Sequence, residues 1–325
     1  MEKLETNWQI FEASDNDWTS AVKNADGYNY LLSNEWSNHL KNSGWECLRF
    51  ISKNKHKVSF IQGFVKNFPF RIGILWFPDW VVGNHTKLID PVNDIKKLLG
   101  LKVIYIRFRS HKTYSKEQFR QLNNSFSRAE IDLDTGLTMH LSLLNSLPEM
   151  QNHLSKNWKR NLKRSNRVEC KIIKITDPNI VNQLYQELTR IKKIKKPFKK
   201  DEIFSLMESW KDKLTILGAV TDDGKIHSLR GAIIENNIAV DIFAAANNFA
   251  RKNYLSYRVC WELVCTCKRK GAEYFDFNGV DRLNMGVYNF KKGTGAKRIK
   301  TLGEFEYSDS KLLRKLVNFV IGRSK

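Results

Sequence analysis

A ligand-binding segment is predicted close to the C-terminal end of the chain. An apolar strand, Tyr274–Phe277, runs into Asn278-Gly279, and the pair Phe290-Lys291 follows a short polar loop, with Gly293 just beyond it. Asn-Gly is a turn signal, and glycine lets the backbone approach a ligand closely. Lys291 therefore supplies a cation at a point where a ligand can come near the chain, which indicates a site as well as a fold.

A second group of cations follows the spacing of one helix face. Its members are three or four residues apart, so their charges converge along one stripe: Lys156, Arg160, Lys163 and Arg167. An arginine offers a phosphate a bidentate and permanently charged partner, whereas a lysine contributes mainly field. The stripe, with Arg164 beside it, predicts a phosphate-binding surface. A solvated helix face is the alternative.

The helix that carries this stripe begins at a capping signal. Ser146 can cap it, and Pro148 falls in its first turn. Met150, Leu154 and Trp158 then share one face of the same helix. One amphipathic helix would therefore pack on its apolar side and present the cations on the other.

The charge balance of the chain favours anionic partners. Its 325 residues include 55 Lys and Arg against 34 Asp and Glu, which gives a net charge of +21 and a pI near 9.7. A surface of this sign attracts polyanions and anionic membranes, so nucleic acid, phosphorylated lipids and nucleotide-linked sugars are all admissible partners. Part of this charge comes from lysines that are scattered singly along the chain. For these lysines, a generally lysine-rich composition explains the charge as well as a binding function does.

The sequence offers no pattern for a metal site, a disulfide framework or a membrane span. Cys265 and Cys267 are separated by one residue rather than two, and His, Cys and carboxylates do not cluster at ligand spacing. We therefore predict reduced thiols and neither a metal nor an organic cofactor. The charged N-terminal residues lack a secretory signal, and no run of about 18 apolar residues occurs. We expect a soluble cytoplasmic protein that could still touch the inner membrane surface.

The first part of the chain has the pattern of an α/β unit. Its expected elements, in chain order, are helices near 15–24 and 33–43, strands at 46–52, 58–65 and 72–77, a helix at 90–100 and a strand at 103–108. A strand pair, a strand, a helix and a further strand form a mixed-sheet pattern.

The second part repeats this succession. After a strand with His140 and the basic helix, we expect a strand at 170–175, a helix at 178–194, strands at 214–220, 226–235 and 238–245, a helix at 254–270 and a strand at 273–277. Asp223-Gly224 and Asn236-Asn237 are turn signals of a strand meander, and Gly271 is a natural helix C-cap. The pattern predicts two copies of one α/β unit, at residues 1–137 and 138–325.

Two segments admit two interpretations each. The lysine-rich residues 192–200 are either a solvated connector or a loop that closes over a substrate. Residues 309–321 combine apolar and basic residues at helical spacing, which suits a helix docked on the core or one lying on a membrane surface. We expect a docked helix, because covering a core is the commoner use of this pattern.

The second part resembles the Fem-type aminoacyltransferases of peptidoglycan bridges. Members of that family carry a basic helix of the sort Lys-x-x-Arg-Asn-Ile-Arg-x-Ala, and residues 156–165 read KNWKRNLKRS here. They also carry a Gly-ended helix before a Tyr-Asp-hydrophobic-Gly strand and then a Phe-Lys element, which residues 270–279 and 290–293 match. The match is dense over 155–302. It is only architectural over 8–108.

In that first part the likeness rests on two features. Trp36 follows a helix start, and the strand at 73–76 ends at Pro78. The family usually shows a Pro-Arg-Gly-Pro-like turn there, whereas this chain has Pro78-Asp79-Trp80. This departure puts substrate contacts by the first part in doubt.

The resemblance implies an α/β fold of two tandem acetyltransferase-like (GNAT-like) units. No coiled-coil arm is expected, since the chain has no long charged heptad insertion. The implied activity is transfer of an aminoacyl group from aminoacyl-tRNA to an amine of a phosphate-bearing cell-envelope precursor. That precursor would belong to peptidoglycan or surface polysaccharide and would be nucleotide- or lipid-linked.

The same match assigns roles to residues. Lys291 would lie near the reacting ester and stabilise negative charge as the amine attacks. Asp276 is a candidate base, with organisation of the following turn as the alternative. His140 could face the same cleft or be structural. The candidate substrate-binding residues are Lys156, Trp158, Arg160, Arg164, Tyr254, Phe290 and Trp36.

The donor is indicated by one turn. Acetyl-CoA-dependent enzymes of this fold carry an Arg/Gln-x-x-Gly-x-Gly/Ala turn, whose amides hold the pyrophosphate at a helix N-terminus. Residues 251–256 read RKNYLS here, so Tyr254 stands where the first glycine would allow close phosphate approach. This favours aminoacyl-tRNA. The alternatives are an acyl-CoA- or acyl-carrier-dependent N-acyltransferase acting on an amino sugar, and a non-catalytic basic module that binds nucleic acid or a membrane.

Overall fold

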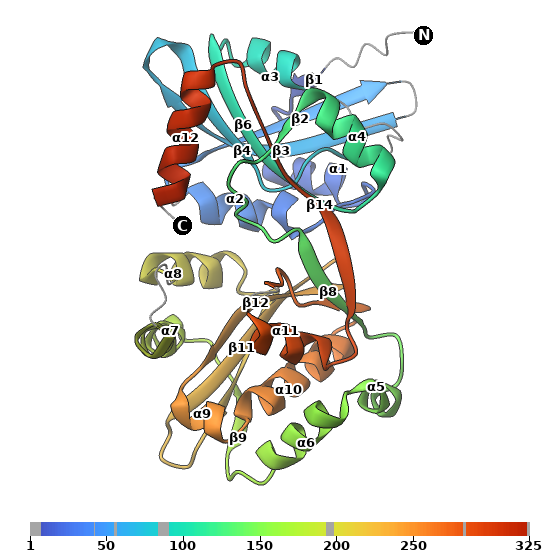
Figure 1. The fold of residues 1–325 in the computed structure, drawn as a ribbon, viewed down its shortest axis with the longest axis vertical. Coiled ribbons are helices and arrows are strands. Elements are labelled where there is room, and N and C mark those ends of the chain that lie inside the picture. The colour runs from blue at the N-terminus through green and yellow to red at the C-terminus, as the bar shows by residue number, and fades with distance from the viewer. Residues whose placement is uncertain are drawn as a thin grey trace. The chain divides into compact units, whose positions relative to one another are not determined.

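The chain folds into two compact α/β units. The computed structural model describes residues 8–41, 43–54, 57–83, 91–192, 198–281 and 284–323 (Figure 1). Unit 1 is formed by Met1–Gly136 together with Lys300–Lys325, and unit 2 by Leu137–Ile299. The sequence predicts a division after residue 137, close to the first of these boundaries, but it places residues 300–325 in the second unit. They cluster with unit 1 because the last strand, β14 (Lys297–Ser308), pairs there with β6 (Val103–Thr113).

The sheet of unit 1 is mixed. Its strands follow in the spatial order β1 (Trp8–Ile10), β2 (Glu46–Asn54), β3 (Lys57–Phe68), β4 (Ile72–Phe77), β6 and β14. Neighbours are antiparallel except β4 and β6, which run parallel with Ile72 opposite Val103. The short strand β5 (Val82–Gly83) pairs with β3, and β7 (Ser127–Arg128) pairs with β14.

Stacked aromatic rings form part of the core of unit 1. Trp80 stacks on Phe108 with ring centroids 3.8 Å apart, and Phe108 stacks in turn on Phe305 of β14 at 5.5 Å. All three rings are buried, so β14 belongs to this core by packing as well as by pairing. The helical elements are α1 (Asp15–Val22), η1 (Tyr30–Leu32), α2 (Asn34–Lys41), η2 (Pro69–Arg71), α3 (Val92–Leu98), α4 (Lys116–Ser125) and α12 (Lys311–Arg323).

Unit 2 is built on a second mixed sheet. Its spatial order is β8 (Leu137–Ser142), β13 (Tyr274–Asp276), β12 (Ile238–Ala246), β11 (Ile226–Glu235), β10 (Leu214–Val220) and β9 (Lys171–Lys174). Only β12 and β13 are parallel neighbours. The strands β10, β11 and β12 form the meander that the turn signals predict.

Helices cover both faces of the central strands of unit 2. One face carries α10 (Leu255–Arg269), which packs on β10 and β11, while the other carries α7 (Pro178–Lys192) (Figure 1). Covering on both faces explains why β11 is buried at seven consecutive residues. The remaining helices are α5 (Leu147–His153), α6 (Lys156–Ser165), α8 (Lys200–Ser209), α9 (Asn248–Lys252) and α11 (Met285–Lys292).

The apolar face of α10 anchors the unit 2 core. Leu255, Val259, Leu263 and Cys267 are spaced four residues apart and are completely buried, as one stripe of a helix requires. The cysteines of α10 are buried free thiols. Within the described residues, no group of His, Cys and carboxylates could hold a metal ion, and no helix is long and apolar enough to cross a membrane.

Several elements differ from the sequence-based expectation. The single basic helix is two helices, because Ser155 starts α6 anew by accepting a hydrogen bond from the Trp158 amide at 3.3 Å. The elements α8 and β14 lie where none was expected, and Lys291 lies on a helix, α11, that was not expected either. Part of the lysine-rich segment, residues 193–197, lies outside the described residues.

Candidate active site

A cavity of about 560 Å³ opens in unit 2 beside the starts of α10 and α11. Strand β12 contributes the small side chains Ala244, Ala245 and Ala246 to its wall, which leaves room for a ligand. The polar part of the lining is mainly cationic and includes Lys192, Arg230, Asp241, Arg251, Ser256 and Lys291. The cavity is therefore suited to a ligand that carries negative charge.

Lys291 is a buried cation in this wall. Its side chain is 7% exposed, and Nζ donates hydrogen bonds to the carbonyl oxygens of Phe277 at 2.6 Å and Gly279 at 2.8 Å. An ammonium has three N–H donors, and the third has no acceptor among the described residues. Burial lowers the pKa of Lys291 below its ordinary value, while the Asp241 carboxylate opposes that shift. The side chain thus presents one free donor and a positive charge in a fixed position.

The position of Lys291 depends on Trp158. The fully buried indole donates its N–H to the carbonyl oxygen of Phe290 at 3.0 Å, and its ring lies 5.7 Å from the Phe290 ring. A Cβ on Gly293 would lie 2.8 Å from the Trp158 ring, so glycine is required there for packing. The sequence suggested that Gly293 lets a ligand approach the backbone. In the structure, Gly293 instead makes room for the Trp158 indole. Trp158 therefore supports the cavity wall from behind.

A buried ion pair that sequence reasoning missed lies beside the lysine. Arg230 donates from Nε to Asp241 Oδ1 at 3.0 Å and from Nη2 to Oδ2 at 2.5 Å. Both side chains are less than 10% exposed, and the guanidinium lies 5.2 Å from the Phe290 ring. Burial alone would lower the pKa of Arg230, but the Asp241 carboxylate raises it, so the arginine stays charged. One feature of the sequence could have indicated this pair. Arg230 and Asp241 are opposite charges in two apolar strands that the Asn236-Asn237 turn connects.

Tyr254 lines the cavity at the start of α10. Its backbone is left-handed, with φ 60° and ψ 19°, which is the conformation that glycine would adopt without strain. Arg164 donates from Nη1 to the Tyr254 hydroxyl at 3.2 Å, and its guanidinium lies 5.4 Å from the ring centroid. A tyrosine thus occupies the turn where the acetyl-CoA enzymes place a glycine, and an arginine of α6 holds it.

The rest of the basic stripe lies away from the cavity lining. Lys156 and Arg160 are exposed on α6, and Arg160 donates to Asn157 Oδ1 at 2.6 Å. Phe290 lines the cavity as expected of a substrate-binding residue, whereas Trp158 is a core residue. Of the cations predicted to bind substrate, Arg164 is the one that contacts a cavity residue directly.

Asp276 has the contacts of a residue that organises its turn. Its carboxylate accepts hydrogen bonds from the Thr138 hydroxyl and, at 2.8 Å, from the Asn278 amide, and it lies 3.4 Å from Nε2 of His140. Burial alone would raise the pKa of Asp276, but His140, Thr138 and the Asn278 amide lower it. A carboxylate with a lowered pKa is a weak base at neutral pH. Neither Asp276 nor His140 lines the cavity.

The residues singled out in the first part of the chain lie in unit 1. Trp36 packs edge to face against Tyr30 at 5.6 Å and near the ring of His39 at 5.4 Å. Asp79, in the turn that departs from the family pattern, is buried and accepts hydrogen bonds from the amides of Trp80 and His111. This carboxylate organises the turn from within.

Comparison with known proteins assigns the fold to a class. The fold is that of tandem acetyltransferase-like enzymes: a tandem GNAT protein from the clavulanic acid biosynthesis pathway is 10% identical with a TM-score of 0.58, covering 94% of this chain and 99% of that one. The L-PGS structure from Bacillus licheniformis is 14% identical with a TM-score of 0.54, covering 99% of both chains. The protein is an acyltransferase.

A match to a family model gives a more specific assignment than the fold does. A model of the FemAB family matches residues 147–321, which is more than half of the chain, and the protein belongs to that family. The crystal structure of FemX has a TM-score of 0.79 at 12% identity and covers 95% of this chain and 100% of FemX. No curated protein sequence matches the chain. The Fem-type resemblance and the tandem fold predicted from sequence are confirmed.

Proposed function

We propose that this FemAB-family protein transfers an aminoacyl group from aminoacyl-tRNA to an amine of a cell-envelope precursor. The observation that carries the proposal is Lys291, a buried cation in the wall of a cavity with one N–H donor that has no acceptor in the described ranges. In the reaction the amine forms a C–N bond to the ester carbonyl carbon, and the C–O bond to the tRNA ribose then breaks. Negative charge develops on the carbonyl oxygen, and a fixed cation in a secluded site stabilises it.

Among the described residues that line the cavity, Asp241 is the one carboxylate that could accept a proton from the amine. The carboxylate of Asp241 is engaged by both arms of Arg230. The attacking amine loses a proton, and the leaving ribose oxygen gains one, so the substrates and water can complete the exchange. The role assigned to the protein is therefore electrostatic and positional.

The cavity and the comparisons support aminoacyl-tRNA as the donor. Lys192 and Arg251 add positive charge to the lining, which suits the phosphates near the end of a tRNA. Tyr254 fills the turn that would otherwise bind the pyrophosphate of CoA. A further solved structure of similar fold is described as the C-terminal domain of a putative lysylphosphatidylglycerol synthetase, 12% identical with a TM-score of 0.54. Its name describes aminoacylation of an envelope component.

The acceptor in this proposal bears a phosphate and is nucleotide- or lipid-linked. The exposed Lys156 and Arg160 on α6 are the candidate phosphate ligands, since both are free to reach an anion in solvent. The proposal requires no metal or organic cofactor. It places the enzyme in the cytoplasm, where aminoacyl-tRNA is made, with peripheral access to the membrane.

The test is a transfer assay with radiolabelled aminoacyl-tRNA and precursors extracted from the host. We expect transfer that ribonuclease abolishes and that Lys291→Met slows roughly 10²-fold or more. Lys292→Met is the matched control, because the neighbouring lysine is exposed on the same helix. Circular dichroism would verify the fold of each variant.

Two results would overturn the proposal. Transfer from acyl-CoA that survives ribonuclease would make the protein an N-acyltransferase of amino sugars. Equal rates for wild type and Lys291→Met would remove the lysine from the mechanism.

A further inference from the structure

The C-terminal helix α12 presents an apolar stripe to solvent. Leu312 is 69% exposed, Leu316 54%, Phe319 57% and Val320 62%. Their spacing of three, four and eight residues places them on one face of the helix. Exposed apolar residues are unremarkable singly, but a contiguous group marks an interaction surface.

Polar contacts fix the opposite side of α12 to unit 1. Asn318 is 3% exposed and donates from Nδ2 to Glu306 Oε2 and to Glu130 Oε2, each at 3.1 Å. One turn earlier, Arg314 donates from Nε to Glu306 Oε1 at 2.9 Å. Glu306 is completely buried on β14. Leu313, Val317 and Ile321 are half-buried, so α12 has apolar residues on two sides, and those of the stripe are the ones that remain exposed.

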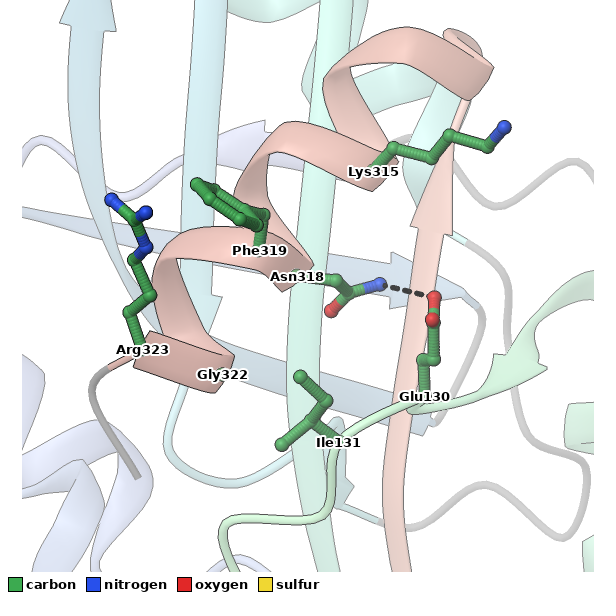
Figure 2. A pocket seen from close by; sticks show the side chains of 7 residues that line it. All are labelled: Glu130, Ile131, Lys315, Asn318, Phe319, Gly322 and Arg323. Carbon is green, nitrogen blue, oxygen red and sulfur yellow. Dashed lines mark hydrogen bonds between the residues drawn. The ribbon is translucent and has the colours of Figure 1, made fainter.

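Figure 2 shows this orientation in the hollow of about 430 Å³ beside the helix. Asn318 points toward Glu130, whereas Phe319 and Arg323 extend from the other side of α12. A Cβ added at Gly322 would lie 3.1 Å from the Ile131 side chain, so the helix packs closely on the underlying segment at this point. The outward direction of the apolar stripe is therefore built into the fold.

The charges around the stripe indicate what covers it. The sequence of α12, KLLRKLVNFVIGR, contains four basic residues and no acidic one. Arg314 is paired with Glu306, and Lys311, Lys315 and Arg323 remain beside the apolar face. Apolar residues flanked by cations are the composition of helices that lie in the surface of an anionic bilayer. A second copy of this chain would instead bring like charges together.

A second exposed apolar element lies at the same end of unit 1. Phe70 in η2 is 87% exposed, and the register of β4, β6 and β14 places η2 at the same end of the sheet as the start of α12, with β6 between them. Phe70 and Arg71 both have left-handed backbones, with φ 63° and 61°. For bulky side chains this conformation costs roughly 1–2 kcal/mol per residue. The chain thus holds an aromatic ring in solvent at a conformational cost.

We infer that the outer face of α12, with Phe70 as a second anchor, docks this protein on an anionic membrane surface. Since no described helix can span a bilayer, the contact is peripheral. The apolar stripe enters the boundary between headgroups and acyl chains, and the flanking cations contact anionic headgroups. This inference does not depend on the transfer reaction, although it fits a lipid-linked acceptor.

The test is cosedimentation of the full chain with vesicles, in the absence of any substrate. Phosphatidylglycerol mixed into phosphatidylcholine provides the anionic vesicle, and pure phosphatidylcholine the neutral one. We expect binding to the anionic vesicles that weakens with salt, and a loss of at least about tenfold in the double variant Leu316→Ser/Phe319→Ser. Leu144→Ser is the matched control, since Leu144 is 61% exposed but lies in unit 2.

A second double variant tests the charges separately. Lys315→Glu/Arg323→Glu leaves the apolar stripe intact, and we expect it to lose the preference for anionic over neutral vesicles. Equal binding by wild type and Leu316→Ser/Phe319→Ser, with both folded by circular dichroism, would overturn the inference. So would a wild-type dimer that the same substitution converts to a monomer without any vesicle binding, because α12 would then contact a second copy. Transfer activity is not part of either readout, so failure here leaves the proposed function untouched.

Discussion

The indole N–H of Trp158 and the carbonyl oxygen of Phe290 are joined by a hydrogen bond of 3.0 Å. The bond ties α6 to the residue immediately before Lys291, so a core side chain determines where the cation of the cavity lies. Its effect on function is indirect, since Trp158 itself does not line the cavity.

Replacing Trp158 with phenylalanine should show whether this indole positions Lys291 for the reaction. The change removes this hydrogen bond, which contributes about 1 kcal/mol, and leaves a small gap in the core. We expect a lower melting temperature and a lower kcat with little change in KM, because the lysine loses its fixed position. Trp80→Phe is the control, as that buried indole nitrogen has no hydrogen-bond partner within the described part of the chain and lies in unit 1. Unchanged kcat in Trp158→Phe would show that Phe290 needs no such anchor.

The pH dependence of transfer should report the lowered pKa of Lys291. The lysine must be protonated to stabilise negative charge, so kcat should fall as pH rises through a pKa below the ordinary 10.5. In Lys291→Arg this alkaline decline should disappear, because arginine stays charged. Spontaneous hydrolysis of the ester at high pH must be subtracted with a no-enzyme control. An identical alkaline limb in both proteins would assign it to another group.

The contribution of Lys291 to stability should change with pH in the direction opposite to kcat. Because the folded pKa of Lys291 is lowered, the unfolded chain binds more protons between that pKa and 10.5. The free energy of unfolding of the wild type, relative to Lys291→Met, should therefore rise with pH in this window.

The Arg230–Asp241 pair should behave as a unit in thermal unfolding. Arg230→Met leaves a buried carboxylate without a partner, which costs roughly 3–5 kcal/mol, whereas Arg230→Met/Asp241→Leu should lose less than the two single variants together. The exposed pair of Lys211 and Glu208 is the control, and Lys211→Met should change stability by less than about 1 kcal/mol. Additive losses at Arg230 and Asp241 would mean that the two side chains act independently.

Tyr254→Gly tests the left-handed turn at the start of α10. Glycine adopts φ 60° without strain, so this variant should be at least about 1 kcal/mol more stable than Tyr257→Gly, which places glycine inside the helix. It should also gain thermal stabilisation by CoA, since the side chain no longer obstructs a phosphate. If CoA stabilises both proteins equally, Tyr254 is not what discriminates against that donor.

Asp276→Asn distinguishes the two roles open to this carboxylate. Its contacts predict a loss of stability with kcat reduced by less than about tenfold, whereas a general base would contribute typically 10²–10⁴-fold. Because the pKa of Asp276 is lowered on folding, its contribution to stability is present above its ordinary pKa near 3.8 and is lost as pH falls below that value. Melting curves at pH 7 and pH 3 should therefore differ more for wild type than for Asp276→Asn.

Local signals predicted much of the fold. Asp223-Gly224 and Asn236-Asn237 mark the turns of the β10–β11–β12 meander, and the strand bounds at 214–220 and 226–235 agree with the structure. Strand β14 was missed because its first four residues, Lys297-Arg298-Ile299-Lys300, are strongly basic and have no alternating apolar pattern. Its place is decided by pairing with β6, far away in sequence.

The sequence predicted only part of the candidate site, because some of its contacts also depend on residues far apart in the chain. Lys291, Phe290 and Tyr254 stood out through local motifs, and all three line the cavity. Arg230 and Asp241 meet because Ala232 lies opposite Asp241 and Arg230 follows two residues along on the same face of the sheet, so the contact is recognised only once the strand register is known. Trp158 looked like a binding residue because it lies among cations, but helical spacing turns its ring toward the core.

The return of the chain to unit 1 through β14 has a consequence for biosynthesis. The ribosome releases β6 long before the strand that pairs with its open edge, and the whole of unit 2 is made in between. Until Phe305 emerges, the aromatic stack on Phe108 is incomplete, and a bare strand edge is open to aggregation. Unit 2 is contiguous and can fold first. The nascent protein should therefore form the cavity of unit 2 before its N-terminal unit is complete. A chain truncated before β14 should be less soluble, although its unit 2 cavity could still form.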